Sequence, residues 1–333
     1  MPVQTRTKSF KPLQYIKILF TMSKDDEEDT PAAVIENPSN PYIRPYGKPL
    51  VAAHRAGAGI VPENTLMAFE LCMQNDSFDI DLFELDVHLT RDGELVVLHN
   101  KTFDATSNAV EAFGKKKIYP IDYTMKQLQV LNLGENFELN GEYPYRGLRG
   151  EAIPENLRVH TLDDILDCVR EKGSKPYYFS IDVKNHGDLG RKAADRLYKV
   201  LGERDMYGNV IAASFNPSVS KHYDAACPGM RRSAGPFEVL KFYFYSRSGA
   251  DLGNKGIQYS LLQIPYGVYR RRGKEVINLG TRALINYAHG NHIAVQYWTI
   301  NNADDMRKLR GNGCDCIMTD YPDMAYTVLT GGK

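Results

Sequence analysis

Leu82-Phe-Glu-Leu-Asp-Val87 is an apolar run interrupted by two carboxylates, Glu84 and Asp86. Residues two apart in a β-strand point to the same face, so the segment predicts a strand with both carboxylates on one side. An earlier apolar run, Pro49-Leu-Val-Ala-Ala-His54, ends in a second titratable side chain, His54. Such groups are costly to bury at strand ends without a role, so the repeated pattern indicates a functional site.

A hairpin is predicted directly after the acidic strand. The run Glu94-Leu-Val-Val-Leu-His99 begins after only Arg91-Asp-Gly93, and so short a link permits an antiparallel pair but no parallel crossover. Asp-Gly is a preferred pair for a two-residue hairpin turn. With that pair at the centre of the turn, Asp86 is predicted to lie directly opposite His99.

Strand and helix patterns alternate through the rest of the chain. Eight strands separated by helices predict a closed (β/α)8 barrel, the TIM-barrel fold of the α/β class. The predicted strands lie at 50–55, 81–87, 176–183, 209–214, 231–235, 258–264, 293–300 and 315–319. The predicted helices lie at 63–75, 161–172, 188–203, 217–226, 237–245, 281–289, 302–310 and 321–329. Active sites of such barrels lie at the C-terminal ends of the strands, where the two histidines and the carboxylates fall.

Two segments stand apart from this alternation. Residues 101–158 hold one short predicted helix, at 124–132, and are interpreted as a small insertion over the C-terminal mouth of the barrel. The domain prediction is an N-terminal extension at 1–48 and a barrel at 49–330. The apolar run at 15–20 is too short to span a bilayer, so we expect a surface-docked arm, with a peripheral membrane contact or a homodimer arm as alternatives.

Charge and cysteine content exclude some classes of protein. The 333 residues include 41 basic and 41 acidic side chains, which leaves no electrostatic footprint for nucleic-acid binding. The five cysteines form no Cys-x-x-Cys pair, which predicts buried, reduced thiols and a cytoplasmic protein. Any peripheral contact with a membrane is expected only through the extension.

The carboxylates suit a metal site. Glu84 and Asp86 supply two hard oxygen donors, and Asp182 in Phe179-Ser-Ile-Asp-Val-Lys184 adds a third. Three carboxylates favour one divalent cation, Mg²⁺ or Ca²⁺, over Zn²⁺. His88 shares the face of the first two and is interpreted as a rim residue rather than a ligand.

The remaining polar residues suit proton transfer and anion binding. Two histidines beside a cation could exchange protons on opposite sides of a reacting group, which makes His54 and His99 the candidate acid and base. Arg55 and Lys184 could neutralise charge on a phosphoryl oxygen. Together these groups favour cleavage of a phosphodiester, and the sequence leaves open which histidine is the acid.

Several motifs resemble those of the glycerophosphodiester phosphodiesterase family, within the phospholipase C-like phosphodiesterases. They are His54-Arg-Ala-Gly-Ala-Gly-Ile-Val-Pro-Glu-Asn-Thr65, Glu84-Leu-Asp-Val-His-Leu-Thr-Arg-Asp-Gly93 and Val97-Leu-His99. Later segments similar to the family are Ile181-Asp-Val-Lys184, Val295-Gln-Tyr-Trp-Thr-Ile-Asn301 and Ile317-Met-Thr-Asp-Tyr-Pro322. The resemblance covers residues 49 to about 330 in the family's order.

The resemblance implies a TIM barrel that hydrolyses a glycerophosphodiester, such as glycerophosphocholine, to glycerol 3-phosphate and an alcohol. It also implies a role for each residue of the site. These are His54 and His99 as acid and base, a divalent cation on Glu84, Asp86 and Asp182 with Glu63 close by, Arg55 and Lys184 on the phosphate, and Trp298 against the glycerol.

Several departures from the family pattern leave the substrate preference open. Ala56 stands where the family usually has Gly, Asn100 where Asp is common, and Asp182 where Glu is more usual. A second hypothesis is therefore a lysophospholipase D-like or phospholipase C-like enzyme acting on lipid diesters, supported by the apolar run at 15–20 and the Tyr-rich insertion. A third is a binding barrel without turnover.

Overall fold

The computed structural model of the protein describes residues 39–249, 251–252, 256–271 and 274–331. The predictions for the apolar run at 15–20 and for an arm that contacts a membrane or a second copy lie outside the described residues. Among the helices that are described, none has the length and apolar character needed to cross a bilayer.

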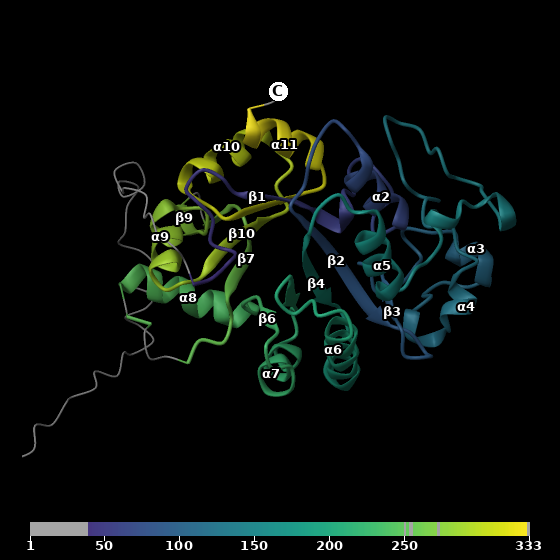
Figure 1. Ribbon diagram of the computed structural model, residues 1–333, viewed down its shortest axis with the longest axis horizontal. Coiled ribbons are helices and arrows are strands. Elements are labelled where there is room, and N and C mark those ends of the chain that lie inside the picture. Colours follow the sequence, from purple (N-terminus) through teal and green to yellow (C-terminus); the bar gives the residue numbers. More distant parts are fainter. Residues whose placement is uncertain (1–38, 250, 253–255, 272–273, 332–333) are drawn as a thin grey trace, which may run out of the picture.

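The central element is a nearly closed barrel of parallel strands, which confirms the predicted fold (Figure 1). Its strands are β1 (Leu50–Ala53), β2 (Leu82–Leu89), β4 (Tyr178–Val183), β5 (Val210–Ala213), β6 (Arg231–Arg232), β7 (Leu261–Pro265), β10 (Ala294–Trp298) and β11 (Cys316–Thr319). Their order around the barrel is β6-β5-β4-β2-β1-β11-β10-β7. A single parallel bridge between Ser233 and Leu261 completes the circle between β6 and β7.

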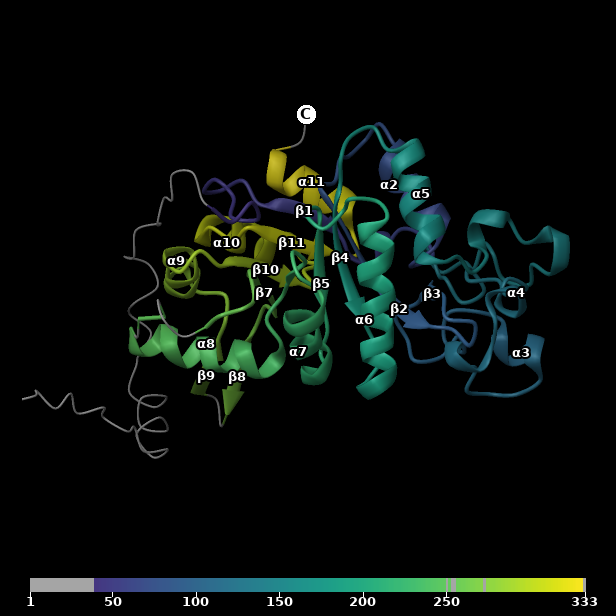
Figure 2. The same cartoon turned by 60° about the horizontal axis from the view of Figure 1, so that its bottom comes forward.

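Helices follow the strands and cover the outside of the barrel (Figure 2). They are α2 (Leu66–Gln74), α5 (Leu162–Lys172), α6 (Gly187–Gly202), α7 (Pro217–Ala226), α8 (Pro236–Ser248), α9 (Arg282–Gly290), α10 (Ala303–Asn312) and α11 (Pro322–Thr330). Side chains of Thr161 and Asn302 cap the starts of α5 and α10, because their oxygens accept from otherwise unpaired backbone N–H groups. The main core lies between strands and helices, and all five cysteines are buried and free of disulfides, as predicted.

Inside the barrel, the inward-facing residues of β2, β4 and β7 change from apolar to polar along the strand. On β2 the series is Leu82, then the two carboxylates; Leu82 belongs to an apolar cluster that also holds Tyr42, from the segment before β1. A polar layer lies above this cluster, where Gln263 Nε2 donates to Ser180 Oγ at 2.7 Å and to Gln296 Oε1 at 3.1 Å. The apolar floor therefore closes one end of the barrel and leaves charged side chains at the other.

The hairpin after β2 is present, but its predicted register is wrong by one residue. In β3 (Leu95–Val97), Val97 pairs with Val87, which sets Asp86 opposite residue 98 rather than His99. The loop has three residues instead of two: Thr90 N donates to Glu94 O at 2.9 Å, and Gly93 adopts a φ of 86°. A three-residue loop of this kind places glycine in the left-handed region at its last position.

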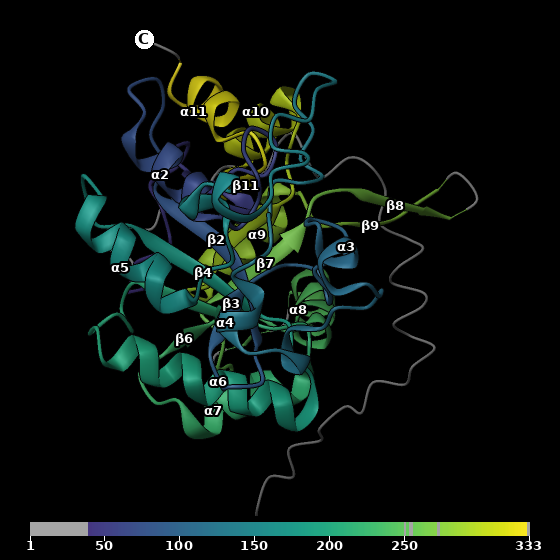
Figure 3. The same ribbon diagram turned by 90° about the vertical axis from the view of Figure 1, so that its right-hand side faces the viewer.

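The insertion forms a small unit on one flank of the barrel, beside β2 and β3 (Figures 1 and 3). It contains α3 (Ala109–Phe113), α4 (Met125–Leu128) and three 3-10 turns, and its apolar side chains form a cluster of their own with Val96 and Leu98. The helix predicted at 124–132 shortens to one turn. A second hairpin, formed by β8 (Val268–Arg271) and β9 (Lys274–Asn278), was not predicted.

The buried carboxylate of Asp315 ties three segments of the barrel together. It accepts hydrogen bonds from the backbone N–H of Arg44 at 2.7 Å and of Val295 at 2.6 Å, and Nε2 of His289 lies 2.8 Å away. We predict that Asp315→Ala lowers the free energy of unfolding by about 3–5 kcal/mol, because it leaves buried donors unpaired. Urea denaturation measures this, with the exposed Glu171→Ala as control; a loss below about 1 kcal/mol would contradict it.

Candidate active site

Two buried carboxylates stand side by side at the mouth of the barrel. The parallel register of β2 and β4 pairs Asp86 with Asp182, so that both side chains point into the mouth. Nζ of Lys184 lies 2.7 Å from Oδ1 of Asp86 and 2.7 Å from Oδ2 of Asp182. These two carboxylates keep the pKa of the half-buried Lys184 above its ordinary value against the effect of burial. The ammonium therefore remains charged between them.

A tight turn after β1 brings the first predicted histidine to the same mouth. β1 ends at Ala53, and His54–Ala56 forms a 3-10 turn in which Arg55 and Ala56 have φ values of 50° and 61°. Left-handed conformations cost a non-glycine residue roughly 1–2 kcal/mol. The turn is held by Glu84, whose Oε2 accepts from the backbone N–H of Arg55 at 3.0 Å.

His54 is held between two carboxylates. Its Nδ1 lies 2.6 Å from Oδ1 of Asp320, and since a carboxylate only accepts, Nδ1 carries a proton. Its Nε2 lies 3.8 Å from Oε2 of Glu84. Asn301 Nδ2 donates to the other oxygen of Asp320 at 2.6 Å and fixes the carboxylate. Sequence reasoning assigned no role to Asp320 or Asn301, although Asp320 directly follows β11, the neighbour of β1, and Asn301 follows β10, the next strand around the barrel.

The second histidine and its neighbours are arranged differently. His99 lines the same cavity, and its Nδ1 lies 3.3 Å from Oδ1 of Asn100, a neutral partner. His88 is not a rim residue, as the sequence suggested, but is buried at 5 % exposure. Burial lowers the pKa of His88 to about 4, which keeps that ring neutral.

The surroundings move the pKa values of the two candidate catalytic histidines in opposite directions. Burial lowers the pKa of His54, but the carboxylates of Glu84 and Asp320 outweigh it and the net pKa is raised. Burial also lowers the pKa of His99, and the positive charge of Lys184 adds to this against the attraction of Asp86. The surroundings thus favour the protonated form of His54 over that of His99.

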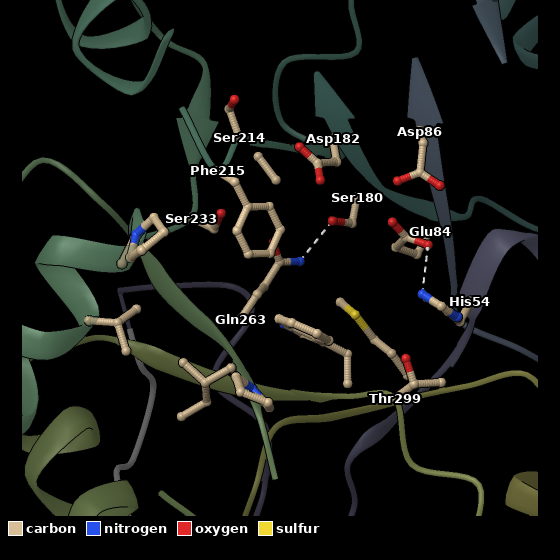
Figure 4. Close-up of a pocket in the computed structure, with 18 of the residues that line it drawn as sticks. His54, Glu84, Asp86, Ser180, Asp182, Ser214, Phe215, Ser233, Gln263 and Thr299 are labelled. Atoms are coloured by element: carbon tan, nitrogen blue, oxygen red, sulfur yellow. Dashed lines mark hydrogen bonds and ion pairs between the residues drawn. The ribbon is translucent and has the colours of Figure 1, made fainter. Parts of the chain in front are cut away.

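These groups line one cavity of about 460 Å³ (Figure 4). The carboxylates of Glu84, Asp86 and Asp182 and the ring of His54 lie along one side of it, and Phe215 lies on the other. Trp298 also lines the cavity, with its ring centroid 5.8 Å from that of Phe215. Among the described residues, none from the predicted insertion at 101–158 lines this cavity.

Glu63 lies behind the other predicted ligands. Its Oε2 pairs with Nη1 of Arg55 at 2.9 Å, and it is absent from the cavity lining given for the described residues. The structure thus brings together the predicted residues of the site, with Glu63 reached through Arg55.

The carboxylate oxygens are of the type that binds hard cations, but the side chains are not arranged as a complete set of metal ligands. Within the described part of the chain, no three His, Cys, Asp or Glu side chains are grouped as metal ligands. Asp182 Oδ1 is buried and has no hydrogen-bond donor, and carboxylate oxygens are the donors that Mg²⁺ and Ca²⁺ prefer. Burial and the neighbouring Asp86 raise the pKa of Glu84 to about 7, and nearby positive charge would reverse this shift. The donor set therefore fits such a cation.

The barrel, with its titratable side chains gathered at the C-terminal mouth, has the architecture of the (β/α)8-barrel enzymes. The chain belongs to the glycerophosphoryl diester phosphodiesterase family, whose model matches residues 54–324. It is 28% identical over 289 residues to a glycerophosphodiester phosphodiesterase of Caldanaerobacter subterraneus subsp. tengcongensis, covering 86% of this chain and 99% of that one. A Bacillus subtilis glycerophosphodiester phosphodiesterase is also 28% identical, with coverage of 85% and 87%. These findings confirm the predicted enzyme class.

Solved structures show the same fold at lower identity. A glycerophosphoryl diester phosphodiesterase domain from Mycobacterium tuberculosis superposes with a TM-score of 0.66 at 18% identity, over 84% of this chain and 98% of that one. An Oleispira antarctica phosphodiesterase, solved with its product sn-glycerol-3-phosphate, gives a TM-score of 0.62 at 20% identity, over 85% and 97%.

We predict that Asp320→Asn lowers the pKa of His54, because the carboxylate that stabilises the imidazolium is lost. NMR titration of the ring signals measures the shift, and Asp323→Asn, an exposed neighbour on α11, is the control. A group with a raised folded-state pKa stabilises the fold below its unfolded value of about 6.5, and the gain disappears as pH rises through the folded pKa. The variant's stability deficit should therefore be greatest in mild acid, below about pH 6.5 but above the lowered pKa of Asp320, because there the imidazolium and the carboxylate are both charged. An unchanged His54 titration would refute the pairing.

Proposed function

We propose that the protein hydrolyses glycerophosphodiesters to glycerol 3-phosphate and an alcohol by acid and base catalysis with two histidines. The observation that carries the proposal is the single cavity in which His54 and His99 accompany Lys184 and the three carboxylates. Family membership and the product bound to the Oleispira antarctica phosphodiesterase support the substrate class.

His54 is the general acid and His99 the general base in this proposal. Two titratable groups whose surroundings drive their pKa values apart are suited to opposite roles. Asp320 and Glu84 favour the protonated form of His54, which can donate to the departing alcohol oxygen. His99 has only Asn100 at its Nδ1 and can accept a proton from the attacking hydroxyl.

The phosphate is proposed to bind between Lys184 and Arg55. Both side chains are only partly exposed at the mouth, where a charge-assisted hydrogen bond is stronger than in open water. Trp298 offers an aromatic face to the glycerol. Glu63 is then a positioning residue, because its carboxylate orients the guanidinium of Arg55 at 2.9 Å.

Glu84, Asp86 and Asp182 are the residues that would hold one divalent cation, Mg²⁺ or Ca²⁺, with Glu63 behind them. A hard cation at these oxygens would supply positive charge for the phosphoryl oxygens of the substrate. The free Oδ1 of Asp182 supports the assignment. Lys184 would remain beside the same carboxylates and complete the positive face of the site.

The attacking group is either water or the 2-hydroxyl of the substrate's glycerol. Attack by the hydroxyl gives a cyclic glycerol phosphate before hydrolysis, whereas attack by water gives glycerol 3-phosphate directly. Quenched reactions analysed by ³¹P NMR separate the two routes. A cytoplasmic location is also part of the proposal and rests on five buried free thiols, which are typical of a reducing compartment.

We predict that His54→Ala and His99→Ala each lower kcat for glycerophosphocholine by about 10²–10⁴-fold, the usual contribution of a general acid or base. His222→Ala, on α7, is the matched control and should retain the wild-type rate. Circular dichroism checks the fold of each variant. Undiminished turnover in both site variants would remove the proton-transfer assignment, and a wild type that binds but turns over no diester would favour the binding barrel.

Removal of divalent cations with a chelator is expected to abolish turnover, and added Mg²⁺ or Ca²⁺ to restore it. Asp182→Asn should weaken the binding of the restoring cation by at least about tenfold, because a ligand oxygen is lost. Calorimetric titration of the chelated protein measures this, with Asp188→Asn on α6 as the control. Full activity after exhaustive chelation would exclude a role for the cation.

A further inference from the structure

The polar layer inside the barrel is unusual for this fold. Ser180 pairs in register with Glu84, and Gln263 with Gln296, while Gln263 donates across the barrel to Ser180. The four side chains therefore lie at one depth. Barrel interiors are filled mainly by bulky branched apolar side chains. The apolar floor around Leu82 follows this rule, whereas the layer above it does not, so its polar groups indicate a role other than packing.

The hydrogen bonds within this layer leave several polar atoms without partners. Nε2 of Gln263 donates to Ser180 Oγ at 2.7 Å and to Gln296 Oε1 at 3.1 Å. Among the described residues, none donates to Oε1 of Gln263 or accepts the hydroxyl hydrogen of Ser180. Nε2 of Gln296 is buried and also lacks an acceptor there. Since buried polar groups are nearly always hydrogen-bonded, the layer lacks a polar partner.

Two members of the layer face the catalytic cavity. Ser180 and Gln263 both line it, and Figure 4 shows the hydrogen bond that joins them. Asp182 and Trp298 stand two residues beyond Ser180 and Gln296, so they lie on the same faces of β4 and β10, one layer nearer the mouth. Two residues of a strand span about 6.6 Å. A glycerol held against Trp298 therefore lies directly above the polar layer.

We propose that Ser180 and Gln263 bind the terminal hydroxyl of the substrate's glycerol, on the carbon farthest from the phosphate. The inference deepens the proposed function and rests on it. A hydroxyl both donates and accepts, so it can give its hydrogen to Oε1 of Gln263 and accept the hydrogen of Ser180. A substrate whose phosphate lies between Lys184 and Arg55 reaches this depth through the three carbons of glycerol.

This pair of contacts makes the site selective for a free glycerol. A site built to hydrogen-bond a hydroxyl rejects an analogue that lacks it, because the site's own polar groups are then left unpaired. A methyl group at this position would leave Ser180 and Gln263 against apolar carbon. Gln296 is a positioning residue for the contact, because its Oε1 accepts from Nε2 of Gln263 and holds that amide in place.

The test compares kcat/KM for glycerophosphocholine and for its 1-deoxy analogue, the phosphocholine ester of propane-1,2-diol, which keeps the 2-hydroxyl. The wild type should favour glycerophosphocholine by at least about tenfold. Gln263→Leu and Ser180→Ala should each lower this ratio at least about threefold, because each removes one hydrogen bond to the hydroxyl. Gln129→Leu, an exposed residue of the insertion, is the control and should keep the wild-type ratio.

The ratio of the two substrates separates contact with the hydroxyl from a structural role. A general loss of packing lowers kcat/KM for both diesters alike and leaves their ratio unchanged. Ser180→Ala removes a single oxygen atom and serves the test alone if Gln263→Leu does not fold.

Each outcome decides between this proposal and the one beneath it. Equal turnover of the two diesters by the wild type overturns the hydroxyl subsite and leaves the proposed function standing. A wild-type preference that both variants retain overturns the assignment to Ser180 and Gln263. Turnover of neither diester overturns both proposals.

Discussion

The register between β2 and β4 is the constraint on which the rest of the site depends. It sets Asp86 beside Asp182, and neighbouring strands lie only about 4.8 Å apart, so two negative charges are held together under low exposure. At about 5 Å and an effective dielectric constant near 20 their repulsion is about 3 kcal/mol. Lys184, two residues beyond Asp182 and on the same face, offsets it. The mouth of the barrel is thus charged in both signs before any ligand enters.

This balance also makes the two histidines unequal. His99 faces the end of the cluster where the ammonium of Lys184 stands, while His54 faces two carboxylates from other strands. The pKa values of the two histidines therefore differ because the charged groups around each ring differ.

Local pattern and chain order predicted the barrel and most of its mouth. These features depend on residues close together in the sequence and can be recognised there. They include the apolar strand runs, the charged residues at strand ends and helix caps such as Thr161. The predicted hairpin register was wrong because it depends on the length of the loop. An Asp-Gly pair is compatible with a loop of two or of three residues, and here Gly93 adopts the left-handed conformation at the last of three. Asp320 was missed because its partner His54 is 266 residues away. The predicted closed barrel makes the first and last strands neighbours, but the sequence does not show which side chains beyond their ends meet.

The short strand β6 gives the barrel an uneven wall. It has only two residues, and the closure to β7 consists of one bridge with flanking bonds such as Ala234 N to Leu261 O at 2.9 Å. Regions with few backbone bonds open locally at a lower free energy than the rest of a fold. Amide hydrogen exchange should therefore be fastest along this seam, and Ala234 and Ile264 on its two sides both line the cavity. Local opening of this seam would therefore change the shape of the cavity.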